Sequence, residues 1–92
     1  MRGDQQLKND IVWTMLRKDV LESNKKMVQT IVGWSVDSHE EGRAKQLIDD
    51  LAQAGVVEWY GGGHRANIRL TSEAAAVQYL KDNDGDLPFG YD

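Results

Sequence analysis

The chain has 92 residues, a formal net charge of −4 and no cysteine. This length predicts one small domain with a modest core, and the composition excludes disulfide bonds and thiolate metal sites. The acidic balance disfavours a partner that is bound mainly through phosphates. No apolar run approaches the ~20 residues of a membrane span and no signal-peptide core begins the sequence, so we expect a cytoplasmic protein.

Two apolar patterns with helical spacing occupy the first third of the chain. The first spans residues 4–21 and predicts an amphipathic helix with this stripe: Leu7, Ile11, Val12, Met15, Leu16 and Val20. A shorter helix is expected over residues 25–33, where Met27, Val28, Ile31 and Val32 share one side. Ser23 or Asn24 can cap this second helix.

A third helix is expected to begin at Ser38. Glu41 follows three residues later, which is the spacing of a capping box. The predicted apolar face comprises Ala44, Leu47, Ile48 and Leu51. Gly55 is placed to end the helix, because glycine tolerates the left-handed conformation that a helix C-terminus often needs.

Alternating segments on both sides of three consecutive glycines predict a β-hairpin. The apolar members are Val57 and Trp59 before the glycines and Ala66, Ile68 and Leu70 after them. Both sets share one face only if paired residue numbers have an odd sum, as in Trp59 with Ala66 and Val57 with Ile68. That register leaves a loop at residues 61–64, and a two-residue Gly-Gly turn meets the same condition. A three-residue loop would turn the polar set inward and is excluded.

A last helix follows the hairpin, with Thr71 or Ser72 as its cap and Ala76, Val77 and Leu80 as packing positions. Residues 83–92 are expected to form an acidic flexible tail, and residues 1–82 the folded domain. The fold class predicted from these elements is mainly α with a small β-hairpin.

The order of the elements resembles a winged helix-turn-helix domain, which has a three-helix core, a two-stranded wing and a C-terminal helix. The stretch LIDDLAQAGVVEWYGGGHRANIRLTSEA is similar to the recognition helix, wing and exit of MarR-like transcriptional regulators. The matching pieces are Leu47, Leu51, Gly55, Val56, Val57, the glycine- and arginine-containing tip at residues 61–65, and Leu70 with Thr71. The family's usual short strand between the first two helices is not evident, and the last helix is short for the family.

This resemblance implies that the protein binds double-stranded DNA, with the third helix in the major groove. Arginine can read guanine and glutamine can read adenine. The implied DNA contacts are His39, Arg43, Lys45 and Gln46 on the third helix, Lys25 and Lys26 at the start of the second, and His64 and Arg65 at the wing tip. A homodimer would form through the C-terminal helix, with Val77 and Leu80 at its seam.

The charge pattern supports a different hypothesis. Residues 23–70 contain six Lys and Arg against six Asp and Glu, so they form no basic stripe. A winged-helix module that binds a protein partner rather than DNA fits this balance. A replication or recombination accessory protein that binds DNA without regulating transcription is a third hypothesis.

Other chemistry has little support in the sequence. His39 and His64 match no metal-ligand spacing. With Asp82 as first ligand, the DNDGD stretch has Leu87 where a calcium loop needs glycine, and it lacks the terminal glutamate. No nucleophile–base set or phosphate loop is present, so we expect neither an enzyme nor a cofactor nor a metal. The three tryptophans, Trp13, Trp34 and Trp59, are expected to pack into the core.

Overall fold

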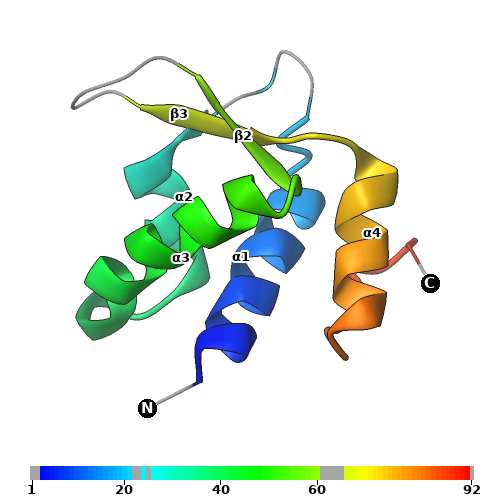
Figure 1. Cartoon of the computed structure of the whole chain (residues 1–92), viewed down its shortest axis with the longest axis horizontal. Coiled ribbons are helices and arrows are strands. Elements are labelled where there is room, and N and C mark those ends of the chain that lie inside the picture. The colour runs from blue at the N-terminus through cyan, green and yellow to red at the C-terminus, as the bar shows by residue number, and fades with distance from the viewer. Residues whose placement is uncertain (1–2, 22–23, 25, 61–65, 92) are drawn as a thin grey trace.

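The computed structural model describes residues 3–21, 24, 26–60 and 66–91. Over these residues the chain is a mainly α-helical domain with a small antiparallel sheet (Figure 1). Its elements, in chain order, are α1 (Asp4–Arg17), β1 (Lys26–Met27), α2 (Val28–Ser35), the 3-10 helix η1 (Ser38–Glu40), α3 (Glu41–Gln53), β2 (Val57–Tyr60), β3 (Asn67–Leu70) and α4 (Glu73–Asp82).

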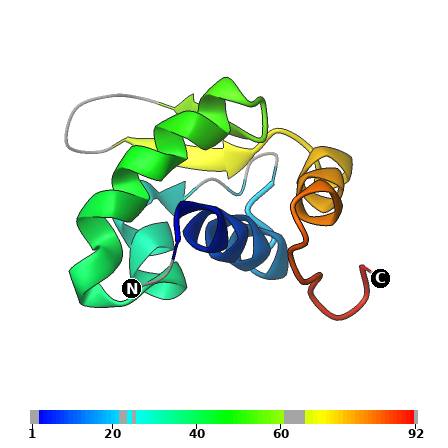
Figure 2. The ribbon, with the colours of Figure 1, turned by 60° about the horizontal axis from the view of Figure 1, so that its bottom comes forward.

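The helices are arranged around α1. Figures 1 and 2 show α1 between α2 and α3 on one side and α4 on the other, with the sheet across one end of this layer. The buried core cluster comprises these residues: Ile11, Val12, Met15, Leu16, Val20, Ile31, Val32, Ala44, Ile48, Leu51, Val56, Val57, Ile68, Leu70, Ala76 and Leu80. Every apolar position expected on the third helix is buried.

The three strands lie in the order β1-β3-β2, with antiparallel pairing throughout. Trp59 is opposite Ile68 and Val57 is opposite Leu70. The odd-sum rule is therefore confirmed, but the register is displaced by two residues from the expected pairing of Trp59 with Ala66. A shift by two preserves the face on which each side chain lies, so the apolar pattern does not distinguish the two registers. The expected loop at residues 61–64 lies outside the described residues.

The second helix begins later than the sequence predicted. Lys26 and Met27 form strand β1, and Met27 has extended backbone angles of φ −64° and ψ 141°. The amide of Val28 donates to the carbonyl of Ala66 at 3.2 Å. Pairing with β3 thus takes precedence over the apolar helical spacing, because it satisfies backbone groups that a helix start would leave open.

The first helix ends at Arg17 rather than at residue 21. Asp19 has a φ of +57°, which breaks the helix. Asn24 closes the following turn, since its side-chain amide donates to the carbonyl of Asp19 at 2.6 Å, and it does not cap α2 as expected. Val20 stays buried outside the helix, and its carbonyl accepts from the amide of Leu70 at 2.9 Å.

The start of the third helix is displaced by one residue from the expected capping box. The amide of Asp37, not Ser38, donates to Oε1 of Glu40, at 3.3 Å. Gly55 has the expected left-handed φ of +80°. Its amide donates to Ala52, and the amide of Val56 donates to Leu51, which together form a Schellman motif. Ser72 caps α4 as expected, accepting from the amide of Ala75 at 3.0 Å.

The tryptophans do not fill the core, contrary to the expectation. Trp34 is 46% exposed, Trp59 is 39% exposed and Trp13 is half-buried. Aliphatic side chains and Met15 occupy the buried cluster of the described residues, so the rings stay at its margin. Trp59 also lies on β2, an edge strand that has a neighbouring strand on one side only.

Candidate nucleic-acid interface

Four of the predicted DNA contacts gather at one end of the third helix. His39 is exposed on η1, and Arg43, Lys45 and Gln46 are exposed on the N-terminal half of α3. Lys26 is separate from this group and half-buried, and it lies opposite the buried Ile68 on the same face of the sheet. The prediction that Lys26 lies at the start of the second helix is therefore wrong. The expected contacts Lys25, His64 and Arg65 lie outside the described residues.

Arg43 is held by the first residue of α1. Its Nε donates to Oδ1 of Asp4 at 3.0 Å, its Nη2 donates to Oδ2 of Asp4, and its Nη1 donates to Oε1 of Gln46 at 2.9 Å. The hydrogen bond from Arg43 lowers the pKa of Asp4, and the bond to Asp4 raises the pKa of Arg43. We call this three-residue arrangement the Asp4 clasp. It places the guanidinium at the side of α3 that adjoins α1.

A second ion pair joins the same two helices. Nζ of Lys8 lies 3.4 Å from Oδ2 of Asp50. On α3, Arg43 and Asp50 are thus both paired with α1. Lys45 and Asp49 remain exposed on α3 without an ion-pair partner among the described residues. The outer surface of α3 therefore has mixed charge, as the counts of acids and bases in the sequence suggested.

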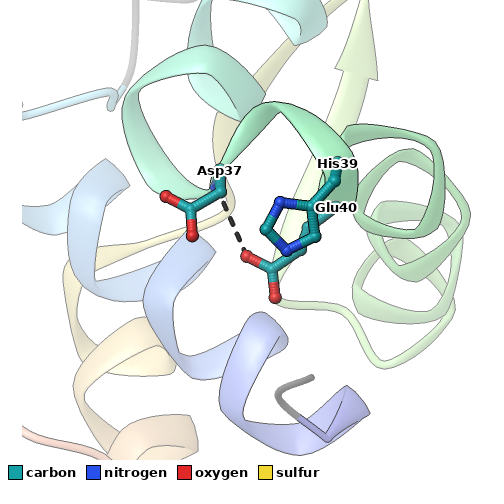
Figure 3. A group of neighbouring side chains, drawn as sticks. All are labelled: Asp37, His39 and Glu40. Atoms are coloured by element: carbon teal, nitrogen blue, oxygen red, sulfur yellow. Dashed lines mark hydrogen bonds between the residues drawn. The ribbon is translucent and has the colours of Figure 1, made fainter.

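Asp37, His39 and Glu40 lie together in the turn before α3 (Figure 3). One ligand-type atom from each lies within 4.8 Å of the others, although Glu40 is buried and the other two are exposed. Carboxylate and imidazole can both bind divalent metals. Here, however, a Glu40 oxygen accepts the Asp37 amide, and the positive end of the α3 dipole disfavours a cation. We therefore assign Asp37 and Glu40 to capping. The His39–His64 spacing gave no sign of this cluster; the short interval from Asp37 to Glu40 could have indicated it.

The outer face of the sheet carries a polar arrangement that the sequence analysis did not identify as a site. Nε of Arg69 donates to Oε2 of Glu58 at 3.0 Å, and the two residues are directly opposite in the β2–β3 ladder. The Arg69 guanidinium also lies 4.5 Å from the centroid of the Tyr60 ring. Strand alternation places all three side chains on this face and could have indicated the group. The two contacts fix the orientation of the Arg69 side chain on the outer face of the hairpin.

Two further cations contact aromatic rings at the C-terminal end of α1. Nζ of Lys18 lies 4.9 Å from the centroid of the Trp34 ring, and the Arg17 guanidinium lies 5.6 Å from that of Trp13. Trp34 is thereby partnered by a cation although it is exposed. The contact of Lys18 with Trp34 ties the start of the α1–β1 connection to α2, whereas the contact of Arg17 with Trp13 lies within α1.

The expected dimer seam on the last helix is only partly accessible. Leu80 is fully buried inside the chain, whereas Val77 is half-buried. Leu87 and Tyr91 pack against the core, and Tyr91 joins Val77 in lining a shallow surface pocket. Leu87 and Tyr91 of the C-terminal segment therefore contact the domain, whereas Phe89 between them is fully exposed. A homodimer through Val77 remains a proposal.

Comparisons of the chain with protein-family models, with curated proteins and with solved structures gave no match. Within the described residues, no helix combines the length and the apolar character that crossing a bilayer requires.

Proposed function

We propose that the chain is a winged-helix DNA-binding domain, used in transcriptional regulation, that contacts duplex DNA with α3 and the β2–β3 hairpin. The observation that supports this most is the place of β1. It stands between α1 and α2 in the chain and pairs with β3, giving the sheet order β1-β3-β2. This strand was the piece of the winged-helix pattern that the sequence did not reveal.

In this proposal, α3 enters the major groove by its N-terminal half. Gln46 offers a side-chain amide to adenine, and Lys45 offers its ammonium to a phosphate. Arg43 can read guanine once Asp4 no longer holds it. Because the outer surface of α3 has mixed charge, we expect weak non-specific binding with a shallow salt dependence, since the slope scales with the number of phosphates neutralised.

The test is equilibrium binding of the purified chain to fluorescently labelled duplex DNA over a salt series. We expect Lys45→Ala to weaken binding on all sequences alike and to reduce the magnitude of the salt slope by about 1. Gln46→Ala should instead relax the sequence preference. The control is Lys81→Ala, since Lys81 is exposed on α4, across α1 from α3. Equal effects of Lys45→Ala and Lys81→Ala, or no binding at low salt, would contradict the proposed surface.

A winged-helix adaptor that binds a protein is the second candidate. Two observations favour it: Lys8 of α1 and Arg43 of α3 are neutralised within the chain, and Trp34 and Trp59 are exposed. Selection from a random duplex library distinguishes the two functions. Enrichment of a common sequence supports the DNA-binding regulator, whereas a random library together with no binding to duplex DNA at low salt favours the adaptor.

A further inference from the structure

We propose that Asp4 is an intramolecular competitor of DNA, which withholds Arg43 from the groove until the Asp4 clasp opens. This inference rests on the proposed function and names a regulation of the same site. It concerns the contact between α1 and α3, which the winged-helix resemblance does not include.

The geometry of the clasp carries the argument. Both carboxylate oxygens of Asp4 accept hydrogen bonds from the Nε–Nη2 edge of the guanidinium, and Oε1 of Gln46 accepts one from Nη1. A guanine edge or a phosphate would use the same paired donors of arginine. Nη2 is needed in either bidentate approach. Asp4 therefore occupies the donors that a DNA contact by Arg43 would use. By holding Arg43 in place, Asp4 also keeps Nη1 of Arg43 bonded to Oε1 of Gln46.

The clasp can open without disturbing the core. The side chains of Asp4 and Arg43 are both 51% exposed, and an exposed ion pair is weak and screened by salt. Asp4 is the first residue of α1, and a Cβ added at the preceding Gly3 would meet no atom within 4 Å. The Asp4 carboxylate also repels an approaching phosphate backbone. DNA thus has to displace a like charge in order to recruit Arg43.

A double-mutant cycle tests the inference on the full chain. The proteins are wild type, Asp4→Asn, Arg43→Ala and the double variant, with duplex-DNA affinity measured at low salt. We expect Asp4→Asn to raise affinity about two- to fivefold, the range that an exposed ion pair permits. In the Arg43→Ala background this gain should fall to the charge-only gain of the Asp49→Asn control, because the released donors are then missing. Thermal unfolding of each variant shows that the differences arise in folded protein.

Asp49 provides the matched control. It is an exposed acid on α3 without an ion-pair partner among the described residues, so Asp49→Asn removes one negative charge but releases no cation. Its gain in affinity should be the same with Arg43 and with Ala at that position. If the gain of Asp4→Asn is equally large without Arg43, Asp4 acts by charge alone and the inference is overturned.

Two further outcomes distinguish failure of this inference from failure of the proposed function. Unchanged or weaker binding by Asp4→Asn, with wild type binding normally, overturns the competitor role and leaves the proposed function standing. Failure of every variant to bind DNA at low salt refutes the proposed function itself, and this inference with it.

Discussion

At the scale of single residues, the pairing of Asp4 with Arg43 has a consequence that depends on pH. Hydrogen bonding by Arg43 lowers the pKa of Asp4, so the folded state holds this carboxyl ionised below the ordinary aspartate value of about 3.9. Whatever stability the pair provides is present above that value. It is lost as the pH falls through the lowered pKa of the folded state.

We therefore predict that Arg43→Ala raises the pKa of Asp4 toward its ordinary value. The reason is that the charged form loses the donor that favours it. The measurement is an NMR titration of the Asp4 carboxyl carbon in both proteins. Lys45→Ala is the control, since Lys45 has no described contact with Asp4, and it should leave the titration unchanged. An Asp4 pKa that Arg43→Ala leaves unchanged would show that the clasp does not form in solution.

Residue-level reasoning from the sequence succeeded where a local cause decides the structure. Gly55 ends α3 and Ser72 caps α4, and both roles follow from the conformation or hydrogen bonding of one residue type. It did not find the contact of Arg43 with Asp4, because these residues are 39 positions apart. Nothing in the spacing of either residue indicates that α1 and α3 bring them together.

At the scale of elements, helix periodicity predicted the existence of α1, α2, α3 and α4 but not every boundary. The periodic stripe of α1 continued to Val20, although Asp19 already leaves the helix. Strand β1 was missed for a related reason. Two residues are too short for an alternating pattern, and their pairing with β3 is a long-range contact.

The capping box before α3 gives a prediction that separates the sequence-based assignment from the structure. Glu40→Ala should lower the free energy of unfolding by about 1 kcal/mol or more, because it removes the acceptor of the Asp37 amide. Glu41→Ala should change it by within about 0.5 kcal/mol, as expected of a surface substitution without such a role. Urea unfolding of both variants provides the comparison. A larger loss of stability from Glu41→Ala than from Glu40→Ala would instead support the capping box that begins at Ser38.

At the scale of the whole molecule, α1 is the element on which the rest depends. Helices α2, α3 and α4 all pack against it, and β3 meets the segment just after it, where the amide of Leu70 donates to the carbonyl of Val20. The candidate DNA surface on α3 and the α4 side are therefore separated by α1 (Figure 1). The position of α4 has a second consequence, because Leu80 faces this shared interior and not a neighbouring molecule.

Leu80→Ala therefore tests the role of α4. Leu80 is fully buried, so the substitution should lower the free energy of unfolding by about 2–5 kcal/mol through the cavity it leaves. The mass in solution should not change, because Leu80 reaches no external surface. Val77→Ala, at a half-buried position, is the comparison and should cost less. Chemical unfolding and sedimentation equilibrium measure the two quantities. A halved mass with unchanged stability would instead place Leu80 in a dimer seam and require α4 to pack differently.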